Sequence, residues 1–337
     1  MSFDPNNIGL RNGNIFGFPY TEEEAEIFII PVAFDATASF GKGTSKGPEA
    51  ILEASTQLDF YSHHTKNAWQ TKVFMTPISK ELGKVNDDLV QKSLEYFDFL
   101  ENGGQLDASP AFQIFVKEMN EAQTHLKAGL KEKVKNLIKD GKKFIVLGGE
   151  HSVPLGAMEA VSEIYSDFGI LQIDAHADLR VAYEGFDQSH ASIMDNALKL
   201  PSLSKLVQVG IRDICDEEVN RIKYDERIDT YYDWNISKSK FTGGNWDKIT
   251  DDIMRRLPKN VYVSFDIDGL KPELCPNTGT PVPGGLEFNE ATYLLQKLKE
   301  SGKNIVGADL CEVGGQDANS IDANVGARIL WELALLF

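Results

Sequence analysis

Closely spaced carboxylates and a histidine could hold metal ions in this chain. Asp174, His176 and Asp178 alternate along one segment, and Asp266 and Asp268 alternate along another. In an extended chain, residues i, i+2 and i+4 share one face, so the side chains of each set can point the same way. Like charges about 4 Å apart repel by roughly 4 kcal/mol at an effective dielectric constant near 20. We therefore expect cations to neutralise this cluster.

A third motif supplies a further candidate ligand, His151, within Gly-Gly-Glu-His-Ser at 148–152. The segments before the three motifs, at 144–147, 168–173 and 261–265, have the hydrophobic runs of buried parallel strands, and ligands bind beyond the carboxyl ends of such strands. Mixed imidazole and carboxylate ligands suit borderline-to-hard divalent ions such as Mn²⁺. Two ions a few Å apart can share a hydroxide and make it a nucleophile near neutral pH.

The rest of the chain alternates strand-like and helix-like patterns. Strands are predicted at 27–32, 143–147, 168–173, 206–209, 261–265 and 305–310, and helices at 48–61, 87–100, 122–141, 154–165, 247–257, 290–301 and 325–337. This alternation predicts an α/β fold with a mostly parallel sheet. No repeat or low-complexity linker divides the chain, so we expect one domain over 1–337, with an insertion or surface excursion at about 62–110.

The bulk properties narrow the class of protein. The 337 residues are 42% hydrophobic and 25% charged, which is typical of a soluble globular protein. The three cysteines show no CxxC spacing and suggest neither disulfides nor a thiolate zinc site. A formal charge of −17 argues against nucleic acid as a partner and mildly favours cationic small molecules. No apolar run of membrane-spanning length and no leader-like pattern occur, so we expect no membrane partner and a cytoplasmic location.

Taken together, the motifs resemble the ureohydrolases, a family that includes arginase, agmatinase, formimidoylglutamase and guanidino-acid hydrolases. The resemblance rests on residues 148–152, 174–178, 264–270 and 278–285 in this order, and it extends from about Ile27 to the C-terminus. It implies an arginase-like, three-layer α/β/α fold, two Mn²⁺ ions (or Ni²⁺), and a homo-oligomer, a trimer or a hexamer. One ion would be held by His151, Asp174, Asp178 and Asp266, and the other by Asp174, His176, Asp266 and Asp268, with Asp174 and Asp266 bridging.

The resemblance also assigns catalytic roles. Glu312 corresponds to the carboxylate that holds the guanidinium of the substrate, a planar cation suited to paired charge-assisted hydrogen bonds. His190 corresponds to a histidine that shuttles protons near the reacting centre. Asp178 would assist the attacking hydroxide through a hydrogen bond.

The substrate is predicted from residues 179–191, which resemble agmatinases more than arginases. The expected reaction is hydrolysis of agmatine to urea and putrescine, with Glu184 near the ammonium end. Arg180 could instead meet a substrate carboxylate, as in guanidinobutyrate, and arginine, formimidoylglutamate and guanidine stay open as alternatives. Two other classes are weighed as well: a one-metal deacetylase, which would lack the His151 ligand, and a catalytically silent, metal-stabilised oligomeric scaffold.

Overall fold

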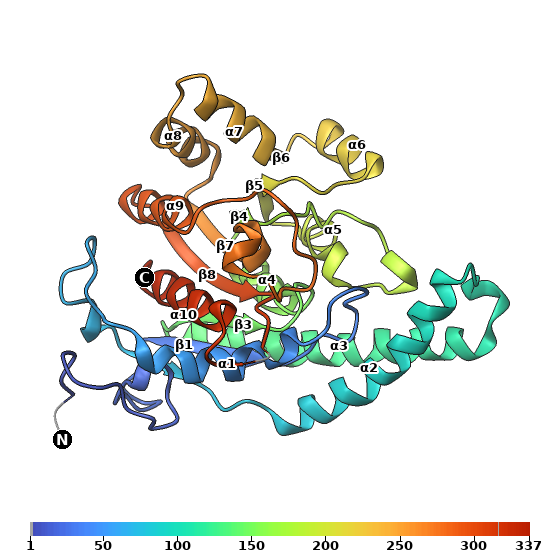
Figure 1. Ribbon diagram of the computed structural model, residues 1–337, viewed down its shortest axis with the longest axis horizontal. Coiled ribbons are helices and arrows are strands. Elements are labelled where there is room, and N and C mark those ends of the chain that lie inside the picture. The colour runs from blue at the N-terminus through green and yellow to red at the C-terminus, as the bar shows by residue number, and fades with distance from the viewer. Residues whose placement is uncertain (1–2, 316) are drawn as a thin grey trace.

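A single parallel sheet forms the centre of the molecule in the computed structural model, which describes residues 3–315 and 317–337 (Figure 1). Its eight strands are β1 (Ile27–Val32), β2 (Val73–Met75), β3 (Lys143–Gly148), β4 (Phe168–Ile173), β5 (Leu203–Ile211), β6 (Ile228–Tyr232), β7 (Asn260–Asp266) and β8 (Asn304–Cys311). They lie in the order β2-β1-β3-β8-β7-β4-β5-β6, and every pairing is parallel. The predicted parallel sheet is confirmed.

Helices cover both faces of this sheet and produce two hydrophobic cores. The helices are α1 (Gly47–Ala54), α2 (Lys80–Glu101), α3 (Pro110–Lys139), α4 (Leu155–Ile164), α5 (Ile193–Ala197), α6 (Asp216–Tyr224), α7 (Asp233–Phe241), α8 (Trp246–Arg256), α9 (Phe288–Glu300) and α10 (Ile321–Ala334). Helices α1, α8, α9 and α10 share one core, and α2 to α5 share the other. In β3, Ile145 and Leu147 enter the first core, whereas Phe144 and Val146 enter the second. Burial on both faces explains the unbroken hydrophobic runs and confirms the three-layer fold.

The elements that the sequence pattern missed lie mostly at the edges of the fold. Strand β6 buries only Ile228, and the hydrophobic run of β2 is only three residues long, so neither gives a clear strand signal. Helices α2 and α3 begin well before the predicted positions because serine caps set their starts: the hydroxyl oxygens of Ser79 and Ser109 accept hydrogen bonds from the amides of Leu82 and Phe112.

Residues 62–110 contribute the edge strand β2 and the helix α2, which runs beside α3 and extends away from the sheet (Figure 1). On α2, the buried ring of Tyr96 packs against Phe115 and Phe186, with ring centroids 5.6 and 5.7 Å away. Phe186 belongs to the loop that follows the Asp-Ala-His-Ala-Asp motif, so this segment supports a loop of the candidate site. That residues 62–110 are an insertion stays a prediction.

Across the described residues, no helix is both long enough and apolar enough to cross a bilayer.

Candidate metal centre and substrate pocket

The predicted site residues meet at the carboxyl ends of four neighbouring central strands. His151 follows β3, Glu312 follows β8, Asp266 ends β7, and Asp174 follows β4. Because these strands are adjacent and parallel, their ends meet at one edge of the sheet, where α/β proteins bind ligands. The structure brings all six predicted metal ligands to this edge.

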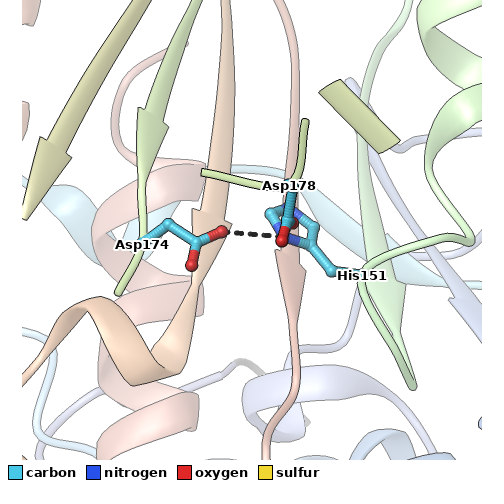
Figure 2. A group of neighbouring side chains, drawn as sticks. All are labelled: His151, Asp174 and Asp178. Carbon is cyan, nitrogen blue, oxygen red and sulfur yellow. Dashed lines mark ion pairs between the residues drawn. The ribbon is translucent and has the colours of Figure 1, made fainter. Parts of the chain in front are cut away.

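His151 lies at the centre of the first ligand group (Figure 2). Its Nδ1 atom is 3.0 Å from an oxygen of Asp174, 2.9 Å from one of Asp178 and 3.3 Å from one of Asp266. In the second group, Nδ1 of His176 is 3.0 Å from an oxygen of Asp268 and 3.7 Å from one of Asp174. Asp174 belongs to both groups, whereas Asp266, the other predicted bridge, lies beside His151 of the first group. The bridging roles stay predictions.

The charges of this cluster are unbalanced without cations. Burial and the charge of Asp174 raise the pKa of Asp178 to about 7, and burial and the charges of Asp268 and Asp174 raise the pKa of Asp266 well above its usual range. Burial opposes the charge of His176, but the carboxylates of Asp268 and Asp174 outweigh it and raise the pKa of His176 to about 12. Divalent ions would reverse this pattern by neutralising the carboxylates. The donor set, its burial and the shared Asp174 therefore fit two divalent ions.

Buried polar side chains orient the ligands from within the sheet. Ser264 on β7 lies 2.9 Å from Nε2 of His151 and donates a hydrogen bond to Asp309 on β8. Since the Ser264 hydroxyl donates to Asp309, it accepts from Nε2 and leaves Nδ1 free for a metal. Gln172 on β4 donates to a carboxylate oxygen of Asp174 at 2.8 Å. The sequence analysis missed these residues, although a polar side chain within a buried strand is costly unless it has a partner and could have flagged them.

Glu312 extends the site beyond the ligand cluster. One of its carboxylate oxygens accepts a hydrogen bond from the amide of His151 at 2.9 Å, and the other is buried without a hydrogen-bond partner. A Cβ atom on Gly279 would lie 3.1 Å from this second oxygen, so the glycine leaves room beside it. Glu312 also has a φ of +61°, a strained value for a residue other than glycine. The unpartnered oxygen is available for a cationic group of a ligand.

His190 returns to the site from the loop after β4. The amide of Arg180 donates to the carbonyl of Ala191 at 3.1 Å and closes this loop. The amide of His190 donates to the hydroxyl of Thr37, and its Nδ1 atom has no hydrogen-bond partner. Burial and the charges of His176 and Lys42 lower the pKa of His190 to about 3, so its imidazole is neutral at pH 7.

These residues line one cavity of about 460 Å³. His151, Asp178, His190 and Glu312 line its inner part, and Ser39, Glu101, Arg180, Tyr183 and Glu184 also line it. The guanidinium of Arg180 stacks over the ring of Tyr183, 4.8 Å from its centroid. A larger hollow of about 1070 Å³ lies along residues 59–69 but includes none of the predicted site residues, so we assign the chemistry to the smaller cavity.

A parallel α/β sheet with a two-ion ligand cluster at its strand ends defines a class of metal-dependent hydrolases. The chain belongs to the arginase family, whose model matches residues 25–336, and it is a ureohydrolase of that family. This membership favours a binuclear centre over the one-metal deacetylase alternative.

Individual relatives agree with this assignment. The chain is 32% identical to an N(1)-aminopropylagmatine ureohydrolase of Thermus thermophilus over 295 residues, which cover 88% of this chain and 84% of the relative. It is 31% identical to an agmatinase of Halalkalibacterium halodurans over 298 residues, covering 87% and 85%. The crystal structure of an agmatine ureohydrolase of Thermoplasma volcanium matches its fold with a TM-score of 0.69 at 23% identity, covering 94% and 92%.

Proposed function

We propose that this protein hydrolyses agmatine to urea and putrescine with two Mn²⁺ ions. The observation that carries the proposal is the unpartnered, buried oxygen of Glu312, a residue that lines the same cavity as the ligand cluster. A carboxylate in this position suits a guanidinium group. The relatives named agmatinase and N(1)-aminopropylagmatine ureohydrolase support a guanidino substrate with a cationic tail. Arg180 also lines the cavity, so guanidinobutyrate stays the alternative to be tested beside agmatine.

His151, Asp174, Asp178 and Asp266 would hold one ion, and Asp174, His176, Asp266 and Asp268 the other. The ions, when bound, lower the pKa of a water molecule so that hydroxide is available near neutral pH. Their identity as Mn²⁺, with Ni²⁺ as the alternative, rests on the oxygen and imidazole donors. Assembly into a homo-oligomer stays a prediction from the family resemblance.

The side chains of the protein orient the substrate and move protons. Glu312 holds the guanidinium so that its carbon faces the ligand cluster, and Asp178 holds the hydrogen of the attacking hydroxide. A C–O bond forms at the guanidinium carbon, and the bond from this carbon to the alkyl nitrogen breaks. Urea forms, and the leaving amine takes up a proton, which we assign to transfer through His190.

Urea release from a panel of guanidino compounds tests this proposal, with Mn²⁺ and Ni²⁺ compared. Agmatine should be turned over faster than arginine, guanidinobutyrate, formimidoylglutamate or guanidine. Glu312→Gln should raise KM and lower kcat together, by about one to two decades in kcat/KM, because a charged hydrogen bond contributes roughly 1.5–3 kcal/mol. Glu332→Gln, a half-buried carboxylate on α10, is the matched control. Faster turnover of guanidinobutyrate would refute agmatine as the substrate and make Arg180 the residue to test.

A further inference from the structure

The residue that follows β5, Arg212, joins three separate segments of the chain. Its guanidinium donates hydrogen bonds to the backbone carbonyls of Asp268 at 2.6 Å, Leu270 at 3.1 Å and Val282 at 3.0 Å. A further bond reaches a carbonyl within β5 at 3.0 Å. The planar guanidinium carries five N–H donors in a fixed fork, so one side chain can hold several carbonyls in a set geometry. Arg212 thus ties the end of β5 to the segment after β7 and to the loop at 278–285.

The main chain of Arg212 reaches the other half of the second ligand group, which consists of Asp174, His176 and Asp268. Its amide donates to the carbonyl of Ala175, between Asp174 and His176, at 2.8 Å. The amide of Ala175 in turn donates to a carboxylate oxygen of Asp268 at 3.0 Å. Arg212 therefore contacts both segments that carry this group, one through its main chain and the other through its side chain.

The paired glycines that end the motif at 278–285 make room for this side chain. Gly284 and Gly285 have φ values of +98° and +96°, which favour glycine. A Cβ atom on Gly284 would lie 3.2 Å from Cδ of Arg212, and one on Gly285 would lie 2.9 Å from its Nη2. The loop is therefore shaped around the guanidinium.

The same loop borders the candidate site. Thr280 lines the cavity, and its hydroxyl donates to a carboxylate oxygen of Asp268 at 3.5 Å. Gly279, the residue before it, is the glycine that leaves room beside Glu312. Because Arg212 binds a carbonyl on either side of this contact, it fixes the loop relative to Asp268.

Asp268 has a position that depends on these contacts. It is buried, and its carboxylate lies 3.0 Å from Nδ1 of His176. Its amide donates to Asp266 at 2.9 Å, and its carbonyl is the one that Arg212 binds at 2.6 Å. A shift of this carbonyl would shift the carboxylate of the same residue. Residues that orient metal ligands from outside change metal affinity by about 10- to 100-fold when they are replaced.

We propose that Arg212 is a positioning residue for the second ligand group and sets how tightly the second ion is held. In the described part of the chain, its guanidinium bonds to neither His151 nor Asp178, the ligands that belong to the first group alone. Loss of the guanidinium should therefore weaken the second ion selectively. This inference rests on the two-ion site of the proposed function but not on its substrate.

Equilibrium binding of Mn²⁺ to metal-depleted protein, without substrate, tests the inference. Arg212→Gln should keep one tight ion and bind the second about a hundredfold more weakly. Arg212→Lys, which keeps the charge but lacks the fork, should bind it about tenfold more weakly. With two ions supplied per chain, electron paramagnetic resonance should show isolated Mn²⁺ in these variants and coupled ions in the wild type.

A second half-buried arginine outside the cavity provides the matched control. Arg227 donates to the carbonyl of Leu198 at 2.8 Å and to the carboxylate of Asp225 at 2.7 Å. Arg227→Lys should bind both ions as the wild type does. Thermal unfolding of the metal-depleted proteins reports whether each variant folds, and Arg212→Lys decides the question if Arg212→Gln does not fold.

The outcomes separate this inference from the proposed function. Equal weakening of both ions in Arg212→Lys, or wild-type binding of the second ion, would overturn the positioning role. Excess Mn²⁺ should restore the urea release of Arg212→Lys, and failure to do so with both ions bound would also count against it. A wild type that binds two ions but releases no urea from any guanidino compound would overturn the proposed function alone.

Discussion

The inner and outer parts of the substrate cavity differ in how the fold builds them. The inner part consists of side chains at the ends of β3, β4, β7 and β8, and five of its six ligands are buried. The outer part includes the loop that carries Glu184 and the end of α2, where Glu101 is exposed. The predicted ligands thus reside on the rigid sheet, whereas the outer part is built from a loop and a helix end, which can vary without disturbing the sheet.

The inner part should be the more sensitive to single substitutions. Asp174→Asn removes the ligand that both groups share. We expect fewer than two ions per chain and a kcat at least about a thousandfold lower, because the pKa of water is no longer lowered toward about 7. Elemental analysis and a urea assay measure both effects. Asp195→Asn, a buried carboxylate paired with Lys199, is the control and should keep both ions. Full metal content with full activity in Asp174→Asn would contradict the shared ligand.

Substitution of His190 tests the inner part of the cavity without altering the six predicted metal ligands. His190→Ala should lower kcat by about 10²-fold, because a positioned proton-transfer group contributes on this scale, and should leave the metal content unchanged. The exposed His63 provides the control His63→Ala, which should keep wild-type kinetics. If turnover of His190→Ala matched the wild type across the pH range, the histidine would have no part in proton transfer.

Much of the inner part could be predicted from the sequence. Strands β3, β4, β7 and β8 are buried on both faces, so each appears as a hydrophobic run, and the ligands follow directly. The outer part could not be predicted in this way. Glu101 and Glu95 are both exposed acidic residues on α2, and only the tertiary arrangement brings one of them to the cavity. Likewise, the edge strand β6 leaves four of its five residues only half-buried and lacks a strand pattern.

Loss of the support that α2 gives to the outer part of the cavity should have the smallest effect on catalysis. Tyr96→Phe removes the hydrogen bond to the carbonyl of Glu184, a contact that contributes about 0.5–1.5 kcal/mol. We expect the KM for agmatine to rise about two- to tenfold, because Glu184 is expected to lie near its ammonium end, with kcat unchanged. Turnover of butylguanidine, which lacks this ammonium group, should not change. Tyr61→Phe, at an exposed tyrosine, is the control. A fall in kcat for butylguanidine would show instead that α2 supports the inner part.

Titration of metal-depleted protein with Mn²⁺, followed by urea release from agmatine, tests the central claim most directly. The six-ligand cluster, with Asp174 in both groups, predicts that activity rises to a plateau at two ions per chain. A plateau at one ion, or no urea at any loading, would contradict a binuclear ureohydrolase centre acting on this substrate.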